Sequence, residues 1–350
     1  MSAPARIYFA AHRHRNLRRG ALVLGLGVLA LCGVLADIVV GPSGLPLAEV
    51  LRVLSGTGEP SRGAEVIVWS VRLPVAVLAL LVGAALSLAG TEMQTVLENP
   101  LAEPFTLGVS SAAALGAGIA IILGWSLPGL PAAWAVTANA FVFALLSLAI
   151  LQGAAGSRAG GPTVVILFGI ALNFTAGSLL ALVQFVASAD ALQQLVFWTM
   201  GSLSGARWPG ILLVALTLAL VLPFSVRASW KLTALRFGAE QAQGFGVDVA
   251  RLRKWALIRV SLLAAAAVSI AGVIGFVGLA APHIARFAVG EDHRFLLPAS
   301  VLTGAVMMSF ASIASKMLVP GILLPIGIVT SLVGLPVFFL LILRRGSLGQ

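Results

Sequence analysis

Charged residues are scarce in this sequence. Asp, Glu, Lys and Arg make up 10% of its 350 residues, whereas a soluble domain carries about 25%. With 59% hydrophobic residues and a mean hydropathy of +1.06, the chain could not cover a water-facing surface with polar groups. The composition excludes a soluble protein and indicates an all-α integral membrane protein whose charge is confined to loops. At about 20 residues per span, the length allows about ten transmembrane helices.

Cysteine and lysine are nearly absent as well. The single cysteine, Cys32, lies inside an apolar run and supports neither a disulfide nor a metal site. The three lysines are Lys231, Lys254 and Lys316. None of them follows Gly or precedes Ser or Thr, so the phosphate-binding motif G-x-x-x-x-G-K-S/T is missing. If ATP drives this protein, another subunit must bind it.

Catalytic groupings are missing too. No carboxylate pair, Ser/His/Asp set or Cys/His cluster stands at a spacing that would form a catalytic or metal centre. His283, which follows a proline in an apolar stretch, is interpreted as a polar packing residue, and His293 as a loop residue. The sequence therefore predicts no enzyme activity, no metal and no cofactor for the chain itself.

The net charge of +10 would suit nucleic acid, but the basic residues flank apolar spans. The predicted spans are 21–40, 71–95, 105–123, 133–152, 164–187, 208–226, 255–271, a span from 275, 296–317 and 325–343. This threading puts 17 of the 22 Lys and Arg on the side of both termini, which places that side in the cytoplasm. A signal peptide is the alternative for the first run, which is long for one. We expect a basic cytoplasmic segment over 1–20, one transmembrane domain over 21–345 and a cytoplasmic tail over 346–350.

A polar break follows the second predicted span. It runs over 92–103 and contains the sequence ENPLAEP at 98–104. Two prolines four residues apart cannot both sit in an ordinary helix interior, and three glutamates would be costly facing lipid. On composition alone this would be a simple connecting loop. A second polar stretch, at about 228–255, is predicted to hold two short helices separated by Gly244-Phe245-Gly246.

Motifs along most of the chain occur in the order of a known family. They are RLP, LLVGAALSLAG, MQ, ENPLAEP and LGVSSAAALGA between 72 and 118, then FGIALN (168–173), WTMGSLSG (198–205), IGFVGLAAPHIAR (274–286), EDHRFLLPAS (291–300) and LPIGIVTSLVGLPVFFLLI (324–342). Over residues 40–345 the chain resembles the FecCD permeases, the membrane subunits of ABC importers for ferric siderophores, haem and cobalamin. The resemblance implies a cobalamin-permease-like type II ABC importer fold with inverted helix repeats. SLAG at 87–90 and SIAG at 269–272, each followed ten residues on by Pro, fit such a repeat.

The resemblance also implies residues for three roles. Asn99 and Leu101 match the family's cytoplasmic gate, which closes by excluding water, and Thr163 matches its second half. Arg72 and Lys316 match external cations that steer docking of a binding protein, although relatives have an Asp at Ser312 and a second Arg at Val75. The surface that couples to the ATPase would comprise Gly238, Ala239, Glu240, Ala242, Gly244, Gly246 and Val247.

The function implied by the resemblance is that of a permease subunit in the bacterial inner membrane, surrounded by lipid and binding no nucleic acid. Its partners would be a second permease subunit, identical or paralogous, two ATP-binding subunits and a periplasmic binding protein. A ferric siderophore is the first choice of substrate, with haem or cobalamin as alternatives. An ion-coupled secondary transporter would need intramembrane carboxylates, and no predicted span has a central Asp or Glu. A membrane-embedded enzyme is disfavoured by the missing catalytic groups.

Overall fold

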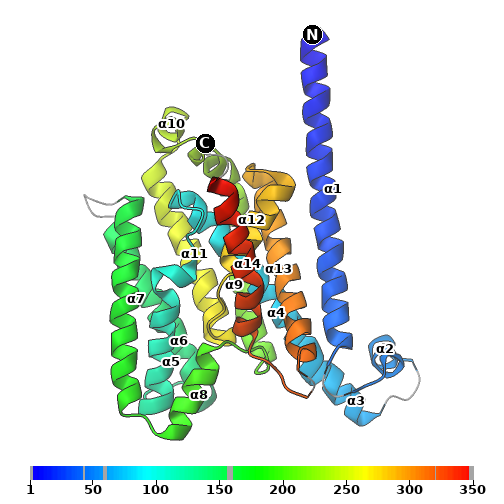
Figure 1. Ribbon diagram of the computed structural model, residues 1–350, viewed down its shortest axis with the longest axis vertical. Coiled ribbons are helices and arrows are strands. Elements are labelled where there is room, and N and C mark those ends of the chain that lie inside the picture. Colours follow the sequence, from blue (N-terminus) through cyan, green and yellow to red (C-terminus); the bar gives the residue numbers. More distant parts are fainter. Residues whose placement is uncertain (1–2, 42–43, 58–60, 156–160, 320, 347–350) are drawn as a thin grey trace.

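The computed structural model describes residues 3–41, 44–57, 61–155, 161–319 and 321–346, and every regular element among them is a helix (Figure 1). The all-α prediction is therefore confirmed. The elements are α1 (Ala3–Val39), α2 (Leu47–Ser55), α3 (Arg62–Ile67), η1 (Val68–Arg72), α4 (Leu73–Val96), η2 (Pro104–Leu107), α5 (Val109–Leu123), η3 (Ala132–Trp134), α6 (Ala135–Ala155), α7 (Pro162–Phe185), α8 (Ala189–Thr199), α9 (Trp208–Leu235), α10 (Ala239–Gly244), α11 (Val249–Ala271), α12 (Val277–Val289), α13 (His293–Met317) and α14 (Ile326–Gly346).

Seven helices within the described ranges are long and apolar enough to cross a membrane, and three further apolar helices, α5, α12 and the first part of α14, are shorter. Each predicted span falls on one of these ten, in order. Two of these helices begin before the predicted spans. Helix α1 begins at Ala3, within the basic segment expected over 1–20, and α4 is extended by α3 and η1 back to Arg62. Residues 156–160, between α6 and α7, lie outside the described residues. So do residues 347–350 of the predicted cytoplasmic tail.

Helices α4, α11 and α13 form the centre, since most of their residues are buried, whereas less than a third of the residues in α1, α7 and α9 are buried. Small residues let the central helices approach closely. A Cβ on Gly83 of α4 would overlap the carbonyl oxygen of Gly304 in α13, and a Cβ on Gly90 would overlap that of Gly278 in α12. At these two crossings there is therefore no room for a side chain, and only glycine fits.

Two buried ion pairs join helices that are far apart in sequence. Lys316 Nζ lies 2.8 Å from Asp37 Oδ1 and ties α13 to α1. Arg259 of α11 lies 2.7 Å from Glu92, and its Nε donates to both carboxylate oxygens. Glu92, which lies where the predicted span 71–95 and the predicted polar break 92–103 overlap, belongs to the helix, because α4 continues to Val96. A carboxylate can stay inside this helix because Arg259 neutralises it.

The chain presents two different ends (Figure 1). Both termini and α10 lie at one end, and α2, α3 and α8 lie at the other. We call these the α10 end and the α8 end. Termini at the same end require an even number of passages between them. The loops with the predicted gate and coupling residues leave α4 and α9 at the α10 end.

Candidate functional site

The segment between α4 and η2 is a turn held by its own backbone. Asn99 Oδ1 accepts a hydrogen bond from the N–H of Leu101 at 3.0 Å, and the Asn99 carbonyl accepts one from Ala102 N at 3.1 Å. Asn99 therefore caps the backbone around Pro100, as an Asx turn does. Leu101 is left 40% exposed. This arrangement presents a large apolar side chain at the α10 end of the chain.

The segment predicted as the second half of the gate lies beside the predicted coupling loop. Gly161 and Pro162, at the start of α7, line a cleft of about 540 Å³ together with Leu97 at the end of α4. The opposite wall comes from α10 and from the first turns of α11, including Ala239. Thr163 is exposed at the start of α7. The cleft thus lies between the end of α4, the start of α7 and the loop with α10. In the sequence analysis, the first two segments were assigned to the gate and the third to ATPase coupling.

The predicted coupling residues form a compact element at the extreme of the α10 end (Figure 1). Gly238 precedes α10 with φ +103°, and Gly246 ends it with φ +80°, conformations that favour glycine. Ala242 and Val247 are buried and face the interior of the loop, with Val247 N donating to Ala242 O at 3.0 Å. Glu240, Gly244 and Gly246 are exposed. Ala239 and Glu240 begin the helix, so the outward-facing part of the predicted set is smaller than expected.

Two aromatic residues at this element were missed by sequence reasoning. Phe237 and Phe245 are 64% and 60% exposed, on either side of α10. Exposed phenylalanines in a polar loop suit a protein contact, since aromatic residues are enriched at interfaces. Their position directly before Gly238 and Gly246 in a polar stretch was the signal available in the sequence.

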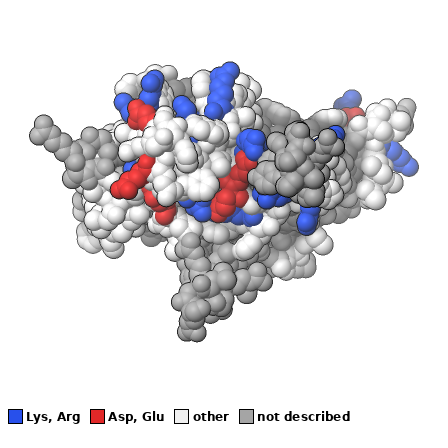
Figure 2. All heavy atoms as spheres, turned by 90° about the horizontal axis from the view of Figure 1, so that it is seen from above, with Lys and Arg blue, Asp and Glu red and all other residues white. Residues whose placement is uncertain are grey.

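Charged side chains gather at the α10 end, which Figure 2 shows from above. Glu98 pairs with Arg253 at 2.6 Å, and Glu291 pairs with both Arg236 and Arg286 at 2.8 and 3.1 Å. These pairs tie the ends of α4, α9, α11 and α12 together.

The interpretation of His293 as a loop residue was wrong. It is fully buried at the start of α13, with Nε2 2.9 Å from the Thr95 hydroxyl and Nδ1 3.2 Å from that of Thr233. It therefore joins α13 to α4 and α9, because both hydroxyls belong to neighbouring helices. His283 Nδ1 lies 2.9 Å from the Leu279 carbonyl, as expected for a polar packing residue. Within the described ranges, no three His, Cys, Asp or Glu residues gather as a metal site.

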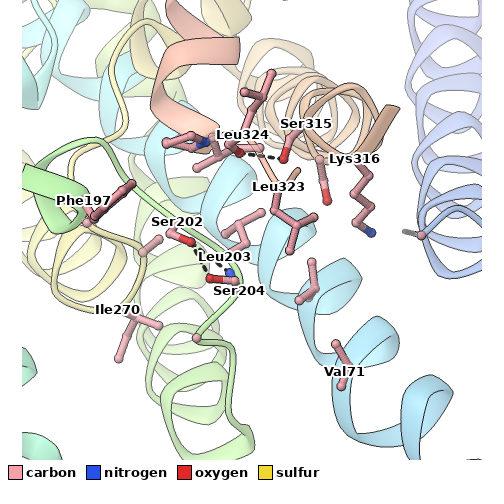
Figure 3. A pocket seen from close by; sticks show the side chains of 18 of the residues that line it. Val71, Phe197, Ser202, Leu203, Ser204, Ile270, Ser315, Lys316, Leu323 and Leu324 are labelled. Atoms are coloured by element: carbon pink, nitrogen blue, oxygen red, sulfur yellow. Dashed lines mark hydrogen bonds between the residues drawn. The ribbon is translucent and has the colours of Figure 1, made fainter. Parts of the chain in front are cut away.

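The predicted docking cations lie together at the α8 end, where they line a cavity of about 620 Å³ (Figure 3). Lys316 points towards α1, where Asp37 holds it. Arg72 is 4% exposed, and its Nη1 donates to the carbonyls of Ile38 and Val39 at the end of α1. Both cations therefore hold α1 in place, and their charges are turned inwards.

Comparisons with known proteins agree along the chain. The sequence profile of the FecCD transport family matches residues 9–344. Similar proteins include the hemin transport system permease protein HmuU of Yersinia pestis (37% identity, covering 79% of this chain and 84% of the relative). They also include the vitamin B12 import system permease protein BtuC of Klebsiella pneumoniae (35%, covering 96% and 98%) and the iron(3+)-hydroxamate import system permease protein FhuB of Bacillus subtilis (36%, covering 95% and 89%). A solved structure of a metal-chelate type ABC transporter in an inward-facing conformation has a TM-score of 0.81 at 29% identity, covering 93% of this chain and 99% of that one.

Proposed function

Because the chain belongs to the FecCD transport family, and so is a membrane-spanning ABC importer permease, we propose that it moves a ferric siderophore across the bacterial inner membrane. The observation that carries the proposal is the family match over residues 9–344 together with the shared fold at a TM-score of 0.81. The family's relatives include permeases for hemin, vitamin B12 and iron(3+)-hydroxamate. Haem and cobalamin are therefore the alternative substrates.

The proposed topology has ten spans, with the α10 end in the cytoplasm. Three observations support it: the termini share one end (Figure 1), basic residues concentrate on that side, and three short apolar helices complete the seven long ones. The proposed inverted repeat relates α4–α7 to α11–α14. It is supported by the matching pattern of a long central helix, α4 or α11, followed by a short one, α5 or α12, after an irregular segment.

The proposed gate is the turn at 99–101, with Leu101 closing the path between two permease subunits and Thr163 contributing from α7. Its support is the exposure of Leu101, which leaves a large apolar side chain at the α10 end available for contact with a second subunit.

The two ATP-binding subunits are proposed to seat on α10. The surface consists of the exposed part of the predicted coupling set, which is Glu240, Gly244 and Gly246. It is extended by the exposed side chains of Phe237 and Phe245. The cleft beside α10 also reaches the start of α7. Movement of α10 would therefore change the surroundings of the proposed gate.

The periplasmic binding protein is proposed to dock at the α8 end. Arg72 and Lys316 shape that surface by fixing α1. The open cations there are Arg52, Arg62 and Arg207, each exposed, which would steer an acidic partner.

The ion-coupled alternative is less well supported by the geometry. The carboxylates of Asp37 and Glu92, which are buried in spanning helices, each face a basic partner. A coupling-ion site would need a carboxylate open to the transport path.

Uptake by the reconstituted complex tests the function. The chain, its ATPase and its binding protein would be placed in proteoliposomes and offered a ferric hydroxamate, haemin or cobalamin with ATP. We expect ATP-dependent uptake of the ferric chelate. Preferential uptake of haemin or cobalamin would change the substrate, and ATP hydrolysis by the isolated chain would refute the class.

A further inference from the structure

Glu103 is buried although it lies in the polar turn that carries the proposed gate. The residue is only 4% exposed, and Leu101 stands two positions before it. Glu98 in the same turn is exposed and pairs with Arg253 at the protein surface. The two glutamates of this turn therefore have different roles, and only that of Glu98 is explained by a surface ion pair.

The carboxylate of Glu103 lies at the start of α12. It accepts hydrogen bonds from the backbone N–H groups of Phe276 and Leu279. A Cβ on Gly278 would lie 3.4 Å from Glu103 Oε2, so there is little space between the carboxylate and the helix. The first N–H groups of a helix have no partner within it, and the residue before α12, Phe276, provides no side-chain cap. Glu103 supplies that cap from a segment more than 170 positions away.

Phe276 connects this contact to a third segment. Its φ is +67°, a left-handed conformation that is strained for a bulky side chain. It packs against Gly334 of α14, where a Cβ would overlap the Phe276 side chain. On the other side, a Cβ on Gly275 would be 3.8 Å from the Phe105 ring, which follows Glu103 in the turn. Continuous contacts therefore run from the turn through the start of α12 to α14.

We propose that Glu103 is a positioning residue that fastens the turn carrying Leu101 to the N-terminus of α12, so that the gate moves together with α12 and α14. The inference rests on the proposed transport function for its consequence, but the anchoring contact itself can be tested without transport. Glu103 acts through Leu101 and does not touch the substrate in this scheme.

The protonation of Glu103 provides a pH-dependent measurement that distinguishes a weakened anchor from a general loss of structure. Burial raises the pKa of Glu103 to about 7, and its hydrogen bonds from the two N–H groups oppose that rise. Other ionisable groups on the elements packed around it are His283 and Arg286 on α12, Glu92 on α4 and Arg259 on α11, the last two being paired with each other. A protonated carboxyl has one good acceptor oxygen left for two N–H donors. The anchor should therefore weaken as pH falls from 8 to 6.

The transport test compares substrate moved per ATP hydrolysed in the reconstituted complex. Glu103→Ala should lower this ratio about tenfold while ATP hydrolysis continues, as for the loss of a typical coupling interaction. The wild type should lose coupling between pH 8 and pH 6, and Glu103→Gln should not change over that range. Glu98→Gln, which removes the exposed charge of the same turn, is the matched control and should behave as wild type. His283→Gln, which removes the imidazole of α12, is a second control and should keep the wild-type pH profile.

Amide hydrogen exchange tests the anchor in the full chain without substrate. Peptides covering 274–281 should exchange faster in Glu103→Ala than in wild type, and those of Glu98→Gln should not change. Exchange in Glu103→Ala equal to that of wild type would overturn the inference. So would a Glu103→Gln complex that loses coupling between pH 8 and pH 6 as the wild type does. If the wild type takes up none of the offered substrates but its exchange responds as expected, the proposed substrate fails and the anchor stands.

Discussion

The ion pair between Glu92 and Arg259 gives the sharpest test of how the centre of this chain is held. Both residues are buried, and the charged atoms are 2.7 Å apart. At an effective dielectric of about 20, that separation corresponds to a Coulomb attraction of about 6 kcal/mol. Removing one partner leaves the other charge buried alone, which costs about 3–5 kcal/mol. Replacing both with apolar residues of similar volume is often close to neutral.

We therefore expect Glu92→Met and Arg259→Met each to lower the free energy of unfolding by about 3–5 kcal/mol, and the double variant to recover most of the loss. Unfolding would be followed in detergent by tryptophan fluorescence, because the chain has seven tryptophans. The pair Glu98 and Arg253 is a control on the same two helices, since it is partly exposed and Glu98→Gln should cost about 0–1 kcal/mol. Additive losses in the double variant would show that the buried pair is not coupled and would refute the reasoning.

Three further outcomes follow from the same structure. Gly90→Val should prevent folding, because its side chain would overlap a carbonyl oxygen of α12, whereas Gly25→Val, with open space around it, should give a normal size-exclusion peak. Lys316→Met should destabilise the chain by leaving Asp37 buried without its cation, and adding Asp37→Asn should restore thermal stability. Because the folded pKa of Glu103 is about 7 and its ordinary value is 4.5, its contribution to stability is complete below pH 4.5 and lost as pH rises through 7. Wild type should therefore be about 1 kcal/mol more stable at pH 6 than at pH 8 through this group, and Glu103→Gln should lack that difference.

The sequence predicted the spans well because hydropathy is a local property. Each predicted span coincides with an observed apolar helix, and motif order indicated the family before any geometry was known. Boundaries were less accurate where a helix continues through polar residues. The span predicted over 71–95 ends one residue before the end of α4, but the residue that makes Glu92 tolerable inside this helix, Arg259, could not be predicted because it is 167 positions away.

The sequence could not predict which groups the polar side chains of the site bind. His293 looked like a loop residue because its neighbours are charged, yet it is buried between the hydroxyls of Thr95 and Thr233. Arg72 matched a docking cation, and the structure shows its guanidinium bound to carbonyls at the end of α1. In both cases a polar residue is satisfied by a helix that is distant in sequence, which single-sequence patterns do not encode.

The cost of ionising Glu103 argues that this carboxylate serves position more than stability. A folded pKa of about 7, against 4.5 in the unfolded chain, means that the ionised form destabilises the fold by about 3 kcal/mol relative to the protonated form. Glutamine would fill the same space without a charge, but its amide would turn N–H donors towards a helix start that itself offers only donors. A carboxylate is the side chain of this size that can accept from both N–H groups at once. The chain therefore holds a costly charge where the turn bearing Leu101 meets α12, as expected if the precision of that contact matters for the gate.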